Sequence, residues 1–111
     1  MIPELSIVVP LYNEADGLVL FHARLMACAE AEAAARGMRV EIVYVDDGSR
    51  DGTAQLAASF PPGSVDVQVL ALSRNFGKEA ALMAGLDHAR GEAVMFMDGD
   101  GQHPPEMIAT F

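Results

Sequence analysis

Carboxylates at the end of an apolar segment are the first candidates for chemistry in this sequence. Asp98-Gly99-Asp100 places two acidic side chains one small residue apart, directly after the apolar run 93–97. Two such carboxylates can converge on one Mg²⁺ or Mn²⁺ ion, which prefers oxygen ligands and often shares them with substrate phosphates. A metal there would neutralise a diphosphate and stabilise it as a leaving group. The alternative interpretation is an ordinary Asp/Gly turn with solvated carboxylates.

A second acidic pair, Asp46-Asp47, follows the apolar run 40–45. Acids at a strand end can accept hydrogen bonds from a nucleobase N–H or a ribose hydroxyl. Gly48, the next residue, permits a positive φ in a tight turn. The alternative is a plain turn in which Ser49 or Asp51 caps a short helix, and the two interpretations can hold together.

Two further segments combine unusual side chains. Pro10 should end the first strand, Tyr12 offers a ring for stacking a base, and Asn13 is placed as a helix N-cap with Glu14 behind it. Lys78 stands at a predicted helix start, where the helix dipole disfavours a cation, so a ligand contact would explain it. The alternatives are an ordinary capped helix start and a solvated lysine.

The elements that must position these residues alternate along the chain. Short apolar runs predict strands at 5–11, 40–45, 65–72 and 93–97. Helical spacing predicts helices at 13–36, 53–60 and 78–89, and Gly37 is a plausible helix stop. Apolar strands separated by helices predict an α/β fold, a Rossmann-like and mostly parallel sheet with helices on both faces. In such sheets ligands bind beyond the carboxyl ends of the strands, where the polar segments lie.

Length and charge limit the possible functions. A chain of 111 residues predicts one domain, and a net charge of −9 with seven basic residues suits neither nucleic acid nor anionic lipid. A phosphate-bearing ligand would therefore need a cation to offset the repulsion. Cys28 is the only cysteine, which fits a reducing compartment, and neither a signal peptide nor a membrane span is evident.

Four segments occur in a fixed order, and together they resemble a known family. These segments are 6–14, 45–53, 75–82 and 97–106. In this combination the chain resembles the start of family-2 glycosyltransferases with the GT-A fold. Asn75-Phe-Gly-Lys-Glu79 and Gln102-His-Pro-Pro-Glu106 make it most similar to the polyprenyl-phosphate branch, which contains dolichol-phosphate mannose synthase and undecaprenyl-phosphate glycosyltransferases.

The resemblance implies roles for individual residues. The nucleotide pocket would be lined by Pro10, Tyr12, Glu14, Asp46, Asp47, Lys78 and Asp98. Within this set Asp46 and Asp47 would contact base and ribose, with Asp47 on the base. The metal, Mg²⁺ or Mn²⁺, would be bound by Asp98, Asp100 and Gln102, and Asp98 and Asp100 are the candidate catalytic residues.

The resemblance also implies a reaction and partners. The expected activity is metal-dependent, inverting transfer of a sugar from a UDP- or GDP-sugar to a polyprenyl phosphate. Residues 1–111 would be the nucleotide-sugar-binding half of the domain, inactive alone, and the acceptor half and any membrane contacts would lie in a missing C-terminal part. We expect the full-length protein at the cytoplasmic side of the membrane, this piece to be soluble, and self-association through an unpaired sheet edge.

Three other functions compete with this one. A Rossmann NAD(P) enzyme would need Gly-x-Gly-x-x-Gly after the first strand, where this chain has Pro10-Leu-Tyr-Asn-Glu14. An aspartyl phosphatase would place its Asp-x-Asp near the N-terminus, followed by Thr or Val. A non-catalytic nucleotide-binding module, or an inactive fragment of such an enzyme, remains the main alternative. Metal dependence of nucleotide binding discriminates it from a transferase.

Overall fold

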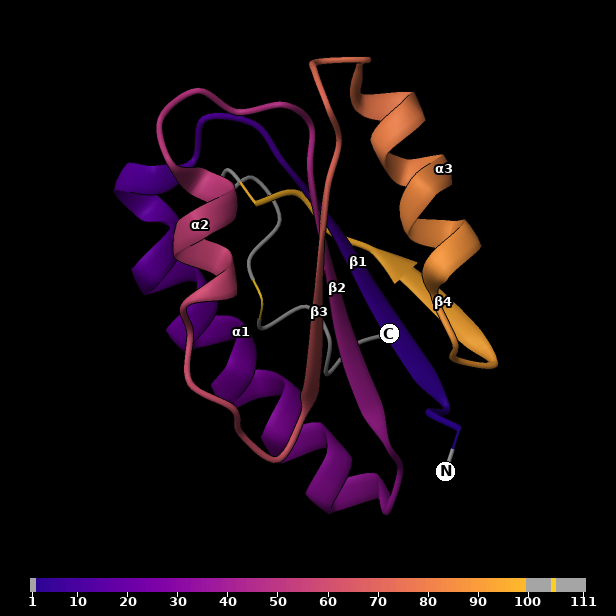
Figure 1. Ribbon diagram of the computed structural model, residues 1–111. Helices are drawn as coiled ribbons and strands as arrows, with labels where there is room; N and C mark the ends of the chain where they lie inside the picture. The colour runs from indigo at the N-terminus through magenta and orange to yellow at the C-terminus, as the bar shows by residue number, and fades with distance from the viewer. Residues whose placement is uncertain (1, 100–104, 106–111) are drawn as a thin grey trace.

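Strands and helices alternate through the whole of the described chain. The computed structural model describes residues 2–99 and 105. Its elements are β1 (Leu5–Leu11), α1 (Ala15–Arg36), β2 (Val40–Asp46), α2 (Thr53–Ala58), β3 (Asp66–Ala71), α3 (Lys78–His88) and β4 (Ala93–Phe96) (Figure 1). The predicted elements are therefore confirmed, with boundaries that move by at most two residues.

The four strands form one parallel sheet in the order β3-β2-β1-β4. Helices α1 and α2 lie on one face of the sheet and α3 lies on the other (Figure 1). The prediction of a Rossmann-like parallel sheet covered on both faces is confirmed. The register pairs Leu11 with Asp46, so β1 and β2 end side by side and release their following loops at the same edge.

The core has two parts because successive side chains of a strand point to opposite faces of the sheet. Ile7 and Val9 of β1 pack toward the α1 side together with Leu18 and Leu25, all fully buried. Val8 packs on the other side, in a smaller cluster under α3. Each fully buried aliphatic side chain contributes about 1.5–3 kcal/mol relative to exposure. Both faces of the central strands are thus anchored, which fixes their ends.

Two local predictions are corrected. Asn13 does not cap α1, because the residue before the helix is Glu14 and the helix has no side-chain cap of its own. Asn13 instead has a positive φ of 53°, a conformation that asparagine tolerates better than most residues. Pro10 does not end β1, which runs on to Leu11. However, Pro10 has no N–H to offer β4, and the β1–β4 pairing stops at Val8 and Phe96. Gly37, as predicted, ends α1 in the left-handed conformation.

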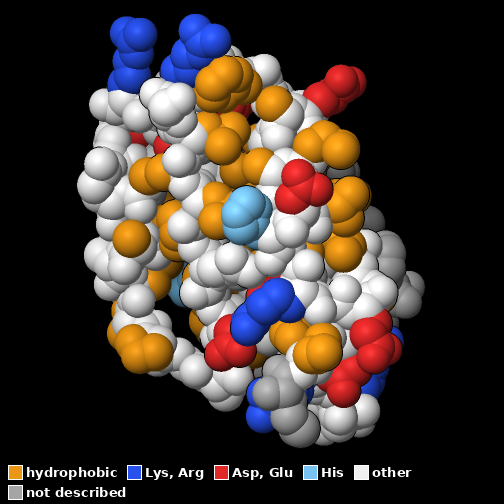
Figure 2. All heavy atoms as spheres, turned by 45° about the vertical axis from the view of Figure 1, so that its right-hand side comes forward, with side chains coloured by type: hydrophobic (Ala, Val, Ile, Leu, Met, Phe, Trp, Pro, Cys, Tyr) orange, Lys and Arg blue, Asp and Glu red, His pale blue; other side chains and the backbone are white. Residues whose placement is uncertain are grey.

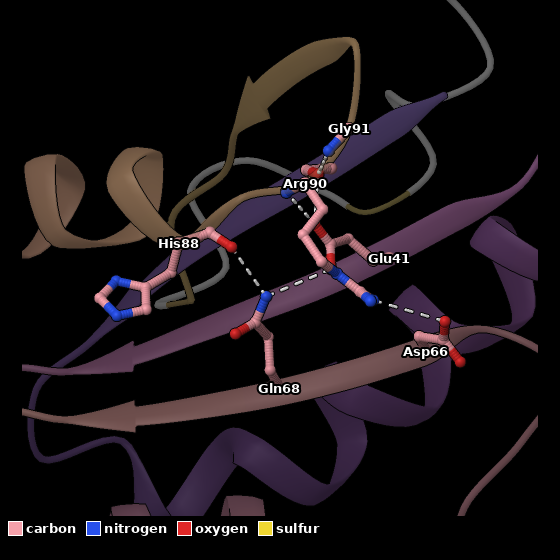
Figure 3. Close-up of polar contacts among 7 residues, drawn as sticks. Glu41, Asp66, Gln68, His88, Arg90 and Gly91 are labelled. Atoms are coloured by element: carbon pink, nitrogen blue, oxygen red, sulfur yellow. Dashed lines mark hydrogen bonds and ion pairs between the residues drawn. The ribbon is translucent and has the colours of Figure 1, made fainter. Parts of the chain in front are cut away.

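A buried carboxylate joins three strands at the edge of the sheet where the strands begin (Figure 3). Glu41 of β2 is fully buried and accepts hydrogen bonds from Ser6 Oγ at 2.6 Å and from Gln68 Nε2 at 3.2 Å. The backbone N–H of Arg90 donates to it at 2.6 Å and Arg90 Nε at 3.1 Å, while the Gly91 N–H donates to Ser6 Oγ at 2.8 Å. This cluster holds the turn between α3 and β4 against the sheet.

The outer face of α3 and β4 carries apolar side chains among charged ones (Figure 2). Met83, Leu86 and Phe96 expose 57%, 43% and 46% of their surface there. None of the helices within residues 2–99 combines the length and the apolar character that crossing a lipid bilayer would require.

Candidate functional site

The loops that follow β1, β2 and β4 leave the sheet at one edge. The Asp47 N–H donates to the Leu11 carbonyl at 2.8 Å, which continues the β1–β2 ladder one step past the strands. The Met97 N–H donates to the Val8 carbonyl at 2.9 Å, so the chain after β4 runs along β1 toward the same edge. Residues 12–14, 47 and 98 are thereby brought together from distant parts of the sequence.

A cavity of ≈ 390 Å³ lies at this edge. It is lined by Pro10, Leu11, Tyr12, Glu14, Asp47, Asn75, Gly77, Lys78, Ala81, Asp98 and Gly99. Six of the residues predicted to bind the nucleotide are in this set: Pro10, Tyr12, Glu14, Asp47, Lys78 and Asp98. Its size is in the range of small-molecule sites. The cavity combines one aromatic ring, three carboxylates and one ammonium group.

Asp47 is almost completely buried and orders the loop that leads into α3. Its Oδ1 accepts the Phe76 N–H at 2.8 Å, and its Oδ2 accepts the Gly77 N–H and the Asn75 side-chain amide, both at 3.0 Å. The loops also touch at Gly48, where a Cβ would overlap the backbone of Arg74. Asp47 therefore fixes the start of α3, from which Lys78 projects.

Asp46 lies outside the lining of the cavity. Its Oδ2 accepts the Ser49 N–H at 3.0 Å, and its Oδ1 accepts the Ser49 hydroxyl at 2.5 Å. The carboxylate is almost completely buried and closes the turn after β2, in which Gly48 has the predicted positive φ of 73°. The turn interpretation therefore describes the contacts of Asp46, and its contact with base or ribose stays a prediction.

Lys78 and Asp98 form an ion pair within the cavity lining. Lys78 Nζ lies 2.5 Å from Asp98 Oδ1, and the side chains expose 59% and 14% of their surface. A cation at the first residue of a helix is disfavoured by the helix dipole. The pairing with a carboxylate from the β4 side offsets that cost and places a positive charge at the cavity.

Tyr12 and Glu14 form the side of the cavity that follows β1. Tyr12 is 46% exposed, so its ring is accessible for stacking, and Glu14 is half-buried. Both stand on a short turn between β1 and α1 that is bonded to the loop after β2. The Asn13 N–H donates to Ser49 Oγ at 2.7 Å, and the Glu14 N–H donates to Thr53 Oγ1 at 2.9 Å.

The cavity lining includes carboxylates, which are the type of ligand that a hard divalent cation prefers. Asp98 supplies an oxygen ligand of the kind that Mg²⁺ and Mn²⁺ prefer, and it already pairs with the cationic Lys78. Among the described residues, no three His, Cys, Asp or Glu side chains gather as a metal site would require. Asp100 and Gln102, the other predicted ligands, lie outside the described residues.

Asn75, Gly77 and Ala81 line the cavity without having been predicted to do so. Asn75 and Gly77 belong to the segment 75–82 that carried the family resemblance, so the motif itself was the available signal. Asn75 contributes by bonding the backbone and the carboxylate of Asp47. That contact joins residues 28 positions apart, which local spacing does not reveal.

Comparison with known proteins gives one family and several similar structures. The family model described as "Glycosyl transferase family 2" matches residues 6–111. The undecaprenyl-phosphate 4-deoxy-4-formamido-L-arabinose transferase of Edwardsiella ictaluri is 44% identical over 105 residues, which are 93% of this chain and 31% of that protein. The chain spans about a third of the length of the curated relatives it matches.

Two solved glycosyltransferases share the fold. S. aureus TarS in complex with UDP superposes with a TM-score of 0.72 and 28% identity, over 87% of this chain and 27% of that one. The mannosyltransferase PcManGT of Pyrobaculum calidifontis, in complex with GDP-Man and Mn²⁺, gives a TM-score of 0.69 and 27% identity, over 90% and 28%. These neighbours are GT-A glycosyltransferases. The expected fold class and family are confirmed, and this chain belongs to glycosyl transferase family 2.

Proposed function

We propose that this glycosyltransferase moves a sugar from a UDP- or GDP-sugar to a polyprenyl phosphate, with inversion and with the help of Mg²⁺ or Mn²⁺. The observation that carries the proposal is the convergence of six residues on one cavity. They come from the end of β1 and from the segments after β1, β2, β3 and β4. The choice of nucleotides rests on the UDP bound to TarS and the GDP-Man bound to PcManGT. The choice of acceptor rests on the similarity to the undecaprenyl-phosphate 4-deoxy-4-formamido-L-arabinose transferase of E. ictaluri.

The cavity offers complementary groups to each part of a nucleotide sugar. The exposed ring of Tyr12 would stack on the base, and Asp47 would accept a hydrogen bond from it. Asp47 already accepts three hydrogen bonds, and an ionised carboxylate has about four acceptor sites, so one remains for a ligand. Lys78 would attract the diphosphate across the cavity.

A divalent cation, held by Asp98, Asp100 and Gln102, would neutralise the diphosphate as it leaves. The acceptor phosphate is itself a strong nucleophile, so little demand falls on a general base. The protein's own contribution would then be orientation of the two reactants and fixed charges around the leaving group. Asp98 would stand beside both the diphosphate and the ribose.

The remaining partners follow from the same proposal. The acceptor site and the membrane contact would belong to parts of the protein beyond residues 1–111, and the protein would work at the cytoplasmic side of the membrane. The exposed Met83, Leu86 and Phe96 favour burial against another surface, and self-association of this chain stays a prediction.

Isothermal titration of the chain with UDP and GDP, with and without Mn²⁺, tests the proposal. We expect binding that needs the metal and that becomes at least about tenfold weaker in Asp100→Ala, a loss of about 1.4 kcal/mol. Asp87→Ala is the matched control, because Asp87 is an exposed acid of α3 outside the cavity. Tight binding without metal, unchanged in Asp100→Ala, would instead support a non-catalytic nucleotide-binding module. Absence of binding to either nucleotide would refute the proposal.

A further inference from the structure

The turn that presents Tyr12 and Glu14 is bonded to a distant part of the chain. Helix α1 begins at Ala15 with no side-chain cap from its N-terminal residue, Glu14. Asn13, in the middle of the turn, has a positive φ of 53°. Such a conformation costs free energy in a residue other than glycine and persists only where surrounding contacts impose it. The contacts that impose it come from the loop between β2 and α2.

Side chains of that loop and of the first residue of α2 accept hydrogen bonds from three consecutive backbone N–H groups at the start of α1. The Glu14 N–H donates to Thr53 Oγ1 at 2.9 Å, and the Ala15 N–H donates to Asp51 Oδ2 at 3.2 Å. The Asn13 N–H donates to Ser49 Oγ at 2.7 Å. These donors would otherwise lack an intrahelical partner, so α1 is capped by another part of the chain.

The acceptors are themselves fixed. Asp51 Oδ1 accepts the N–H of Thr53 at 3.1 Å and the hydroxyl of Thr53 as well, and Thr53 is fully buried. The hydrogen bond from the Thr53 side chain lowers the pKa of Asp51 below its ordinary value. In the reverse direction, the Arg50 N–H donates to Asn13 Oδ1 at 3.0 Å. The two loops therefore form one braced unit.

We propose that Asp51 and Thr53 are positioning residues for nucleotide binding, because they hold the Tyr12–Glu14 wall of the cavity from the neighbouring loop. Neither residue lines the cavity, so the proposed effect acts through Tyr12 and Glu14, which do. The inference deepens the proposed function and rests on it for the identity of the ligand.

The physical effect is on the fraction of molecules in which the Tyr12–Glu14 turn keeps the conformation that binds the nucleotide. Without the Thr53 hydroxyl, the Glu14 N–H loses its acceptor and the turn at Asn13 loses part of what keeps its φ positive. The turn then samples other conformations in which Tyr12 is displaced. Apparent affinity falls in proportion to the fraction of molecules that keep the correct wall.

Variants of Thr53 test this directly. Thr53→Val keeps the shape of the side chain and removes the hydroxyl, whereas Thr53→Ser keeps the hydroxyl. We expect Thr53→Val to weaken UDP or GDP binding about tenfold in the presence of Mn²⁺ and Thr53→Ser to restore it. Asp51→Ala, which removes the acceptor oxygens, and Asp51→Asn, which keeps one, form a second pair of variants. Because Asp51 is exposed, this pair keeps the test valid if Thr53→Val does not fold.

Ser64→Ala is the control. Ser64 Oγ donates to Glu30 of α1 at 2.6 Å, so this change also removes a hydrogen bond between a loop and α1, but away from the cavity. A purely structural role for Thr53 predicts that both changes lower the melting temperature and leave nucleotide affinity alone. The positioning role predicts that Thr53→Val and Asp51→Ala weaken nucleotide binding and that Ser64→Ala does not.

Amide hydrogen exchange separates this inference from the proposed function. Thr53→Val should speed exchange at Glu14 at least about tenfold, and Ser64→Ala should not. Unchanged exchange at Glu14, or nucleotide affinity of Thr53→Val within twofold of the parent chain, would overturn the inference. Failure of the parent chain to bind UDP or GDP would refute the proposed function. Exchange at Glu14 would still decide whether the hydrogen bond to Thr53 holds the turn.

Discussion

At the scale of single residues, hydrogen-bond partners separate two groups that look alike in the sequence and are both buried. Asp46 and Asp47 are adjacent, yet Asp46 bonds Ser49 in its own loop and Asp47 bonds residues 75–77 in another. Successive side chains at a strand end point in opposite directions, so two neighbouring acids reach different loops. A single acidic pair can therefore order both loops beside the cavity.

His22 illustrates how a buried pair sets a pH dependence. Its Nδ1 lies 2.7 Å from the hydroxyl of the buried Tyr44, and its ring stacks on Phe60 with centroids 4.0 Å apart. Burial lowers the pKa of His22 below its ordinary value of 6.5 and raises that of Tyr44. In the range just below 6.5 the unfolded chain then binds more protons than the folded one, which makes the free energy of unfolding fall as the pH is lowered.

We expect urea denaturation followed by circular dichroism to show this loss between about pH 6.5 and pH 5, above the range in which most carboxylates titrate. The double variant His22→Phe with Tyr44→Phe should abolish the slope, because it removes the imidazole and leaves no buried hydroxyl behind. His22→Phe alone should cost about 1–3 kcal/mol through the orphaned Tyr44 hydroxyl. A slope that persists in the double variant would contradict the assignment to His22.

At the scale of elements, the approach of α3 to the sheet depends on a missing side chain. A Cβ on Gly85 would overlap Val8 Cγ1 of β1 and lie 3.1 Å from Val45 Cγ2 of β2. Both valines are β-branched and buried, so they have little freedom to move aside. Gly85 thus lets α3 lie close enough for its first residue, Lys78, to reach Asp98.

Gly85→Ala should therefore lower the free energy of unfolding by about 1–3 kcal/mol through overpacking. Gly17→Ala is the matched control, since a Cβ there has no neighbour within 4 Å and alanine favours a helix by up to about 1 kcal/mol. Thermal denaturation of the two variants gives the comparison. Equal melting temperatures for both would show that α3 can move away from the sheet without cost.

At the scale of the whole molecule, the cavity and the Glu41 cluster occupy opposite edges of the sheet. The cluster joins β1, β2, β3 and the turn before β4, so one carboxylate adds side-chain contacts to the backbone pairing of the strands. Burial alone would raise the pKa of Glu41, but hydrogen bonds from Ser6, Arg90 and Gln68 lower it overall. Its stabilising effect is therefore present above its ordinary pKa of 4.5 and is lost as the pH falls below that value.

We expect Glu41→Gln to lower the free energy of unfolding by about 1–3 kcal/mol, because an amide nitrogen would replace an oxygen that accepts N–H and O–H donors. Asp66 is the other ion-pair partner of Arg90, and its side chain is 66% exposed. Asp66→Asn should therefore change the free energy of unfolding by less than about 0.5 kcal/mol. Denaturant titrations at neutral pH measure both. An equal effect of the two changes would mean that the cluster contributes no more than a surface ion pair does.

The sequence predicted the fold and most of the cavity. Apolar runs separated by helical spacing indicated the alternating elements, and parallel strands must release their polar ends at one edge, which brought Tyr12, Asp47 and Asp98 together as expected. Gly37 and Gly48 were also predictable, because a positive φ favours glycine. These features follow from periodicity and local backbone preference, which the sequence carries directly.

The tertiary structure alone decided which partner each polar group meets. Asn13 was expected to cap α1, but the N–H groups at the start of this helix donate to Ser49, Asp51 and Thr53, about forty positions away. The burial of Glu41 and the close fit at Gly85 likewise depend on elements distant in the sequence. Local spacing fixes the direction of a side chain relative to its own strand or helix, whereas its partner is fixed only when the sheet order places another segment there.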